Sequence, residues 1–331
     1  MQTRPLGRTG LTVSVLGFGC GAVGGLMVRG APADQQRAVA RAVEAAITYF
    51  DTAPSYGDGA SETNLGRVLK ALKPDVRVGT KVRLSAADKT NIAGAVVASM
   101  EASLRRLGRD HVDLFQLHNA ITVDDHPDSI SVRMLRDEIV PAFGRLREQG
   151  KTRFLGITAI GDTKALHDVV GAGLLHTAQV PYNLLNPSLG GAMPAGFPAQ
   201  DYGNLLAQMQ TSGVGAIGIR VLAGGALSGE ATRHPIASPA PEPIGSAHGY
   251  AADLERARRL LPLVTEGHAA TLPEAALRYV IAHPAMSTVL IGIATIDQLE
   301  QAIAAAEKGG LSAAGLQRAA ALQQQFAGEA R

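Results

Sequence analysis

The chain has 331 residues, 46% of them hydrophobic, and a formal net charge of +2. Its charges are interspersed without a basic stripe, so nucleic-acid binding has no support, and no apolar run approaches the roughly 20 residues that a membrane span needs. One cysteine, Cys20, excludes an internal disulfide framework and suits a reducing compartment. Because the start, Met1 to Pro5, also lacks the apolar region of a signal peptide, we expect a cytoplasmic protein.

Short apolar strands alternate with helical patterns along the chain, which predicts parallel strands joined by helices. No linker interrupts this pattern, and barrels of this size are often one domain, so residues 1–331 are expected to form a single domain. Near the start, residues 4–6 and 11–14 are expected to pair as a hairpin. The first strand of the repeating pattern is expected near residues 15–19.

Apolar spacing and helix-end signals predict several of the intervening helices. The first is expected to begin at an N-cap Asp34, and a later one to end at Gly108. A fourth helix is expected to carry Pro141 in its first turn and to end at Gly150. The apolar stripes of the first two are Val39, Val43, Ala46 and Ile47, and Val97, Met100, Leu104 and Leu107.

Ionisable residues follow three consecutive strands of this pattern. Strand 47–50 is followed by Asp51, strand 76–80 by Lys81 and strand 112–117 by His118. Asp51 opens the segment Asp51-Thr52-Ala53-Pro54-Ser55-Tyr56-Gly57, which adds a phenol five residues later. Side chains from consecutive strand ends converge only if the strands are parallel neighbours. A parallel barrel provides this, and its active site lies at the C-terminal rim of its strands.

Each ionisable residue has an ordinary explanation when taken alone: Asp51 as a turn cap, Tyr56 as part of a turn, Lys81 as a surface lysine and His118 as a structural histidine. Their order and spacing together favour a catalytic group.

The second half of the chain continues the alternation of strands and helices. Later strands are expected at residues 154–158, 177–180, 215–220 and 287–291, and a long loop rich in Pro, Ala, Ser and Gly at residues 228–248.

The order of these motifs resembles the aldo-keto reductases, a family of nicotinamide-dependent oxidoreductases. The resemblance covers nearly the whole chain, and it implies a (β/α)8 TIM barrel with an N-terminal β-hairpin and an additional C-terminal helix. It also implies interconversion of an aldehyde, ketone or sugar carbonyl and its alcohol by hydride transfer. The matching segments are 6–14, 51–57, 79–81, 113–119, 153–158, 179–183, 222–225 and 291–292.

The resemblance also implies roles for the four ionisable residues. Reduction of a carbonyl needs a proton donor, but tyrosine is a weak acid with a pKa of about 10. A nearby ammonium favours the phenolate and so lowers that pKa. Tyr56 is accordingly the expected general acid and base, Lys81 and Asp51 are expected to tune it, and His118 is expected to orient the carbonyl oxygen. No metal ligands are assigned.

Cofactor contacts implied by the resemblance lie on the later strand ends. Thr158 and Gln179 are expected at the nicotinamide amide. In the adenosine motif of the family, an Arg and an Asn are replaced here by Ala294 and Ala302, so NAD or NADP is expected without a strong preference for NADP. Two further departures are Ala159 for an Asn and Ile219 for a stacking aromatic. The pyrophosphate loop is expected at Leu222, Gly224 and Gly225, and the adenosine site at Gly292 and Gln298.

Three other interpretations remain beside this one. Residues 19–24 match the dinucleotide fingerprint G-x-G-x-x-G, but helical periodicity begins only near Asp34, whereas the fingerprint requires a helix that opens at the glycines. A Schiff-base lyase using Lys81 needs a lowered lysine pKa, which Asp51 opposes. A non-catalytic, cofactor-binding regulatory subunit is disfavoured by the complete set of four residues. The expected partner is a small carbonyl or sugar substrate.

Overall fold

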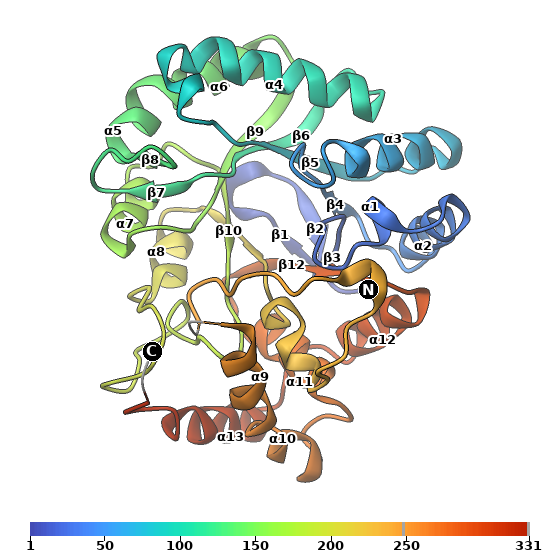
Figure 1. Cartoon of the computed structure of the whole chain (residues 1–331), viewed down its shortest axis with the longest axis vertical. Coiled ribbons are helices and arrows are strands. Elements are labelled where there is room, and N and C mark those ends of the chain that lie inside the picture. Colours follow the sequence, from blue (N-terminus) through green and yellow to red (C-terminus); the bar gives the residue numbers. More distant parts are fainter. Residues whose placement is uncertain (247–248, 330–331) are drawn as a thin grey trace.

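The central strands of the protein close into a parallel barrel, as the computed structural model shows for residues 1–246 and 249–329 (Figure 1). The (β/α)8 fold class is therefore confirmed. Each strand pairs with its neighbours in parallel, and the last pairs with the first. In order round the barrel, the strands are β3 (Leu16–Gly19), β4 (Tyr49–Asp51), β5 (Arg77–Val82), β6 (Val112–Leu117), β9 (Thr152–Thr158), β10 (Thr177–Val180), β11 (Gly215–Gly218) and β12 (Met286–Gly292).

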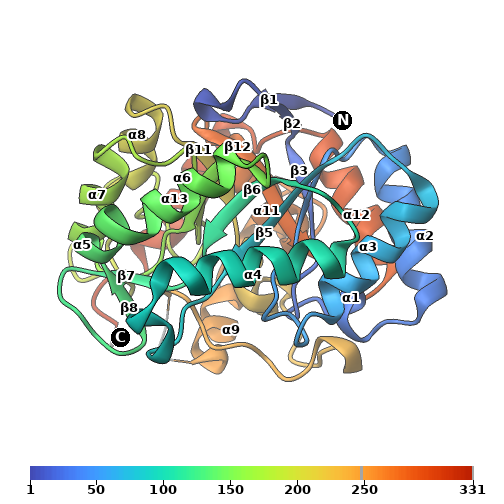
Figure 2. The ribbon, with the colours of Figure 1, turned by 90° about the horizontal axis from the view of Figure 1, so that it is seen from above.

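The expected N-terminal hairpin closes one end of this barrel. Strands β1 (Thr3–Pro5) and β2 (Thr12–Ser14) pair antiparallel around the 3-10 turn η1 (Gly7–Thr9). Arg8 donates hydrogen bonds to the carbonyls of Ser212 and Leu175, just before β11 and β10 begin, so the hairpin lies at the N-terminal ends of the strands. Figure 2 shows it opposite the end that carries the short strands β7 (Ala120–Thr122) and β8 (Ser129–Ser131).

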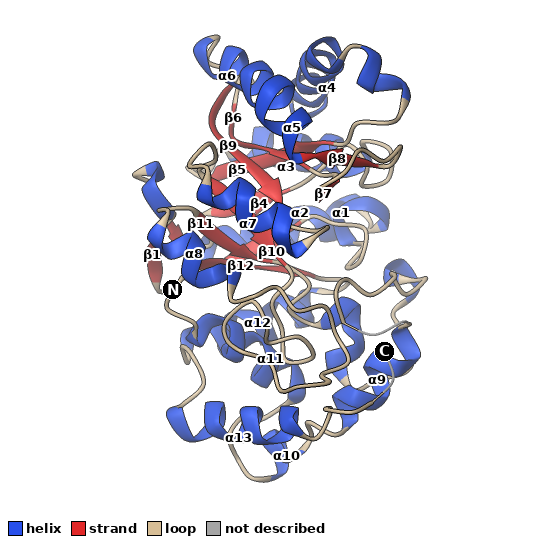
Figure 3. Cartoon of the chain, turned by 90° about the vertical axis from the view of Figure 1, so that its left-hand side faces the viewer, coloured by secondary structure: helices blue, strands red, loops and turns tan. Residues whose placement is uncertain are grey.

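Helices surround the strands, blue around red in Figure 3. The additional C-terminal helix is α13 (Ala313–Gln324). The longer helices of the barrel are α2 (Pro32–Glu44), α3 (Ala60–Leu72), α4 (Ile92–Leu107), α6 (Val140–Glu148), α7 (Thr163–Gly171), α8 (Leu205–Thr211), α9 (Tyr250–Arg258), α11 (Leu272–Ala282) and α12 (Ile296–Glu307). Shorter turns are α1 (Leu26–Arg29), η2 (Ala87–Thr90), α5 (Val132–Met134), η3 (Leu135–Ile139), η4 (Ala223–Ser228), η5 (Pro235–Ala237) and α10 (Pro262–Thr265).

The first long helix, α2, begins earlier than its sequence suggests. Pro32 is its first residue and Ala31 precedes it, so Asp34 lies inside the first turn and the predicted N-cap is wrong. Proline fits this position because its fixed φ suits a helix and its missing N–H would have no partner there. The helix ends at Glu44, which leaves two predicted stripe residues outside it: Ala46 is exposed, whereas Ile47 is buried.

Pro141 lies in the first turn of its helix, as predicted: α6 begins at Val140, so the proline is its second residue. The structure adds α5 and the π-helical turn η3 directly before it. Because proline cannot donate the hydrogen bond of a regular helix, irregular turns collect beside it. Strand β11 ends at Gly218, two residues before the predicted end, because Arg220 has a φ of 54° that no strand accommodates.

The remaining predicted elements lie close to their expected places. Gly108 and Gly150 end their helices, and Met100 and Leu107 are buried in the stripe of α4. The loop at residues 228–248 contains only the short turn η5, and its last two residues lie outside the described part. In the described part of the chain, no helix is long and apolar enough to span a membrane.

Candidate active site

The four ionisable residues meet at the C-terminal ends of β4, β5 and β6. The Lys81 ammonium lies 2.6 Å from Asp51 Oδ2, 2.8 Å from Asp51 Oδ1 and 3.2 Å from Tyr56 Oη. It also donates to the carbonyl of Thr52, 2.9 Å away. The His118 ring packs edge-on against the Tyr56 ring, with 5.8 Å between centroids. Lysine therefore joins the carboxylate to the phenol.

The barrel register explains why these side chains converge. Strand pairing places Asp51 opposite Gly79 and Lys81 opposite Gln116, so the inward side chains of adjacent strands alternate in height. Lys81 itself lies within β5, where the sequence placed it just beyond the strand. Both Asp51 and Lys81 are almost wholly buried. The site is thus held by strands, and only Tyr56 and His118 come from the residues that follow them.

Hydrogen bonds also fix the loop that carries Tyr56. The Thr52 and Ser61 hydroxyls lie 2.8 Å apart, and Ser61 donates to the Cys20 carbonyl at 2.8 Å. These contacts join both ends of the loop between β4 and α3 to Cys20, the residue that follows β3. The Tyr56 amide donates to the Ala53 carbonyl at 3.1 Å, which closes the turn beneath the phenol.

Charge at the site is dominated by the buried pair. Burial acts to lower the pKa of Lys81, but the Asp51 carboxylate and the Tyr56 phenol together outweigh it and the pKa is raised, so the ammonium stays charged. Burial raises the pKa of Asp51, while Lys81 and Gln179 act against that rise. Gln179 Nε2 lies 2.6 Å and 2.9 Å from the two carboxylate oxygens. The carboxylate thus accepts hydrogen bonds from two different side chains.

The pKa values of Tyr56 and His118 depend on burial as well as on the neighbouring charges. Burial raises the pKa of Tyr56, and Lys81 lowers it as expected without outweighing the burial. Burial, then the charges of Lys81 and Arg83, lowers the pKa of His118 to about 3. His118 is therefore neutral near pH 7, and its Nδ1 lies 3.5 Å from the Ser55 hydroxyl. A neutral imidazole can donate a hydrogen bond but carries no charge.

The residues expected to hold a cofactor lie at the ends of β9 to β12. The Thr158 hydroxyl is buried without a hydrogen-bond partner among the described residues, so it is available to a bound group. Gln179, by contrast, already directs its amide nitrogen at Asp51. Leu222 lies just before η4; Gly224 and Gly225 lie inside it, with φ of 70° and 111° that favour glycine.

The expected adenosine turn follows β12. Gly292 ends that strand, and Gln298 lies in the first turn of α12, where its Oε1 accepts the Ala294 amide at 2.7 Å. The Ala294 and Ala302 methyl groups are both buried. Among the arginines that follow β11, Arg233 donates to the Gly224 carbonyl at 2.6 Å. A cation therefore lies at the glycine loop, although none lies in the adenosine motif.

The glycines of the G-x-G-x-x-G match at residues 19–24 allow two loops to approach each other closely. A Cβ on Gly24 would lie 2.3 Å from the Ile293 amide, and one on Gly21 would lie 3.7 Å from the Tyr56 ring. The first loop therefore passes against the end of β12 and beside the phenol. A single helical turn, α1, does begin after Gly25, contrary to the expectation of no helix before Asp34. The closed barrel nevertheless excludes the doubly wound topology of the dinucleotide fold.

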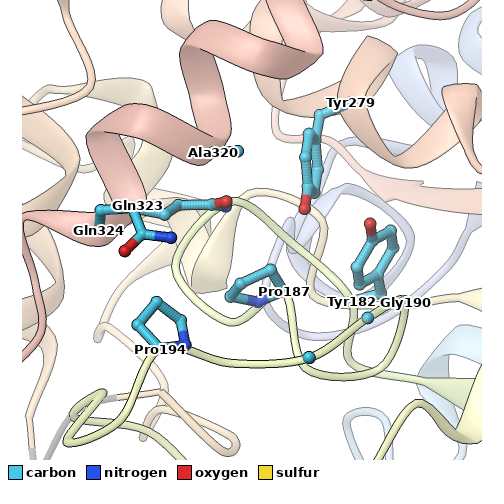
Figure 4. A pocket seen from close by; sticks show the side chains of 10 residues that line it. Tyr182, Pro187, Gly190, Pro194, Tyr279, Ala320, Gln323 and Gln324 are labelled. Atoms are coloured by element: carbon cyan, nitrogen blue, oxygen red, sulfur yellow. The ribbon is translucent and has the colours of Figure 1, made fainter.

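A separate pocket of about 140 Å³ lies outside the barrel mouth (Figure 4). It lies between the loop after β10 and the helices α11 and α13, and the hydroxyls of Tyr182 and Tyr279 point toward one another there. Gln323 on its wall donates to the Leu184 carbonyl at 2.9 Å. None of the four ionisable residues lines this pocket, so it is distinct from the candidate active site.

Sequence reasoning overlooked two groups at the site. The Thr52 carbonyl accepts from Lys81, and Gln116 lies opposite Lys81 on β6. The available signal was strand alternation: Gln116 lies two residues before His118, so both side chains face the barrel interior. A main-chain carbonyl leaves no such signal.

Comparison with known proteins identifies the family. The model of the Aldo/keto reductase family matches residues 15–323. L-galactose dehydrogenase of Arabidopsis thaliana is 31% identical over 310 residues, which cover 92% of this chain and 88% of that protein. L-glyceraldehyde 3-phosphate reductase of Escherichia coli (strain K12) is 27% identical and covers 92% and 87%. The holo form of aldo-keto reductase AKR11C1 from Bacillus halodurans superimposes with a TM-score of 0.70 at 25% identity, covering 97% and 96%. The chain therefore belongs to the aldo/keto reductase family and is an oxidoreductase.

Proposed function

We propose that this protein interconverts a carbonyl and its alcohol by hydride transfer, with Tyr56 as the general acid and base. The observation that carries the proposal is the Lys81 ammonium, which contacts both the Asp51 carboxylate and the Tyr56 hydroxyl. A buried cation beside a phenol stabilises the phenolate that forms when the proton leaves. That stabilisation serves proton transfer in either direction of the reaction.

The residues present suit a nicotinamide cofactor, NAD or NADP, which when bound supplies or accepts the hydride. The unpaired Thr158 hydroxyl is a free partner for the nicotinamide amide. The glycine loop at Gly224 and Gly225 allows a pyrophosphate to approach the backbone closely. Tyr56 donates the proton to the carbonyl oxygen in reduction and removes it in oxidation. The neutral His118 donates a hydrogen bond that orients the same oxygen.

The substrate that we propose is a small aldehyde or sugar. Two of the relatives carry names of enzymes acting on a sugar or a sugar phosphate, L-galactose and L-glyceraldehyde 3-phosphate. A Schiff-base lyase is disfavoured, because Lys81 is charged and shared between Asp51 and Tyr56, so its nitrogen has no free lone pair. A purely regulatory role is disfavoured because all four ionisable residues are assembled.

Replacing Tyr56 tests the proposal directly. In Tyr56→Phe the proton donor is lost while the ring that packs on His118 remains, so kcat should fall by ~10²–10⁴-fold. Cofactor affinity, measured by fluorescence titration, should stay within about twofold of the wild type. The assay needs a panel of aldehydes and sugars with NAD(H) and NADP(H). A variant that keeps more than about a tenth of wild-type kcat, with chemistry rate-limiting, would remove Tyr56 from the mechanism.

Cofactor choice follows from the charge around the adenosine turn. An arginine bound to a 2′-phosphate contributes ~1.5–3 kcal/mol, or roughly 10–100-fold in affinity. Ala294 offers no such contact, and Asp297 is exposed in the same turn. We expect NAD to bind at least as tightly as NADP in parallel titrations. Asp297→Asn, which removes a negative charge, should tighten NADP and leave NAD nearly unchanged. Wild-type protein that binds NADPH more than tenfold tighter than NADH contradicts this expectation.

A further inference from the structure

The barrel interior holds four buried polar side chains that make no hydrogen bond of ordinary geometry with the described residues. They are Tyr49, Thr177 and Thr288, through their hydroxyls, and Gln116, through both polar atoms of its amide. Burial raises the pKa of Tyr49, and the nearby Gln116 amide acts against that rise, so these two groups lie close together. None of the four side chains is exposed to solvent. They lie on β4, β6, β10 and β12, which are every second strand of the barrel. We call these four residues the polar layer.

The polar layer lies directly beneath the candidate active site. Side chains two residues apart on a strand face the same side. Each of three members accordingly precedes a site residue by two positions: Tyr49 before Asp51, Gln116 before His118, and Thr177 before Gln179. The hairpin side chains Leu6, Leu11 and Val13 form one apolar cluster with the ring of Tyr49 at the N-terminal end of the barrel. The polar groups are thus enclosed between a charged site and an apolar base.

Glycines on the intervening strands let the polar side chains of the layer approach the backbone closely. Barrel interiors are usually filled by bulky branched side chains contributed by alternate strands. Three positions that face the layer carry no side chain at all. A Cβ would lie 2.4 Å from Thr177 Oγ1 and 3.0 Å from Gln116 Cγ at Gly156, 2.3 Å from Tyr49 Oη at Gly79, and 3.2 Å from Thr288 Oγ1 at Gly17.

Unpaired polar groups at such depth are costly unless water completes their hydrogen bonds. A buried donor or acceptor left unpaired loses its hydration without compensation, whereas buried waters characteristically bind two to four such groups. We propose that the polar layer is a binding site for ordered water, and that one such water bridges the Gln116 amide to the Asp51 carboxylate. Gln116 is thereby a positioning residue for the Asp51–Lys81 pair.

The link to Asp51 rests on both geometry and charge. Gln116 pairs in register with Lys81 on the adjacent strand. Its amide acts to lower the pKa of Asp51, behind the larger effects of burial, Lys81 and Gln179, although no hydrogen bond of ordinary geometry joins the two groups. A bridging water converts this proximity into a hydrogen-bonded contact. The catalytic consequence rests on the proposed function, whereas the water site itself does not.

The sign of a stability change tests the water site without any activity assay. Thr288→Val has nearly the same shape and removes one hydroxyl. If that hydroxyl binds water, the melting temperature should fall by about 2 °C, as expected for the loss of one hydrogen bond in a chain of this size. If it is dry and unpaired, the substitution relieves a cost and the melting temperature should stay or rise. The second result would overturn the proposal, and Thr177→Val provides an independent repeat.

The link to catalysis is tested by the pH profile of kcat/KM in the cofactor-saturated enzyme. Gln116→Met keeps the length of the side chain but removes its donors, so the Asp51 pKa should rise. The acid limb of the profile should move upward by about one pH unit, the equivalent of one hydrogen bond to a charged group. Leu114→Met, two residues earlier on the same face of β6, should leave the limb in place. If the acid limb keeps its wild-type position in Gln116→Met, Gln116 does not act on the Asp51 carboxylate and this part of the proposal is wrong.

A crystal structure that resolves buried water gives the third outcome. At least one ordered water should lie within hydrogen-bond distance of Gln116 and of a hydroxyl of the polar layer. A dry interior, with the four groups bonded to one another, overturns the water site. Should Tyr56→Phe retain full activity while the water is present, the proposed function fails and the site stands.

Discussion

At the scale of single residues, Lys81 has more acceptors than hydrogens. Its ammonium carries three hydrogens, yet four oxygens lie within 3.2 Å: both of Asp51, the Thr52 carbonyl and the Tyr56 hydroxyl. The lysine is thus shared between holding the carboxylate and stabilising the phenolate. Because burial raises the Tyr56 pKa, Lys81 limits that rise without reversing it.

Replacing Lys81 should therefore move the Tyr56 ionisation upward. In Lys81→Met the opposing charge is lost and the Tyr56 pKa rises further, so the alkaline limb of the kcat/KM profile should shift to higher pH. Turnover should also fall. Asp51→Asn leaves the ammonium in place and should act more mildly. An alkaline limb that keeps its wild-type position in Lys81→Met would mean that the limb reports a group other than Tyr56.

At the scale of elements, the segment after β11 packs across the first loop. Arg29 Nε donates to the Ile236 carbonyl at 2.6 Å, and Arg233 Nη2 to the Val23 carbonyl at 3.3 Å. Arg233 also contacts the Gly224 carbonyl within the proposed pyrophosphate loop. Two loops that are distant in the sequence are thereby joined by arginine side chains over the proposed cofactor site.

Arg233→Met should loosen this junction. The expected result is faster cofactor release, several-fold by stopped-flow fluorescence, because the glycine loop loses a charge-assisted hydrogen bond. The rate of the chemical step in single turnover should hardly change. Arg258→Met, which removes an exposed arginine paired with Glu255 within α9, is the matched control and should leave release unaltered. Equal effects of both substitutions would rule out a specific role for the junction.

The same scale shows what could be predicted from the sequence and what could not. The strands, their parallel order and the positions of Asp51, Lys81 and His118 followed from apolar runs and strand ends, because local periodicity determines which side chains face inward. The hydrogen bond from Gln179 to Asp51 joins residues 128 positions apart, so no local pattern contains it. The balance between burial and Lys81 at Tyr56 depends likewise on packing, which sequence spacing does not report.

At the scale of the whole molecule, the apolar cluster of the hairpin and the candidate active site lie at opposite ends of the barrel. The hairpin side chains Leu6, Leu11 and Val13 pack with Leu114 and other inward residues at the N-terminal end. The candidate active site lies at the opposite end, with the polar layer between them. A TIM barrel typically carries catalytic groups at its C-terminal face and structural groups at the other. Substitutions at the two ends should therefore affect different measurements.

Leu6→Ala tests this separation. Leu6 is completely buried, so its truncation should lower the free energy of unfolding by ~2–5 kcal/mol through lost burial and the cavity that remains. At a temperature at which the variant remains folded, kcat and KM should stay within about twofold of the wild type, because the hairpin and the four ionisable residues lie at opposite ends of the barrel. Val123→Ala truncates an exposed apolar side chain and should change stability by less than about 0.5 kcal/mol. If kcat fell in Leu6→Ala while the fold persisted, the hairpin would be coupled to the site through the barrel interior, and the polar layer would be the segment that transmits it.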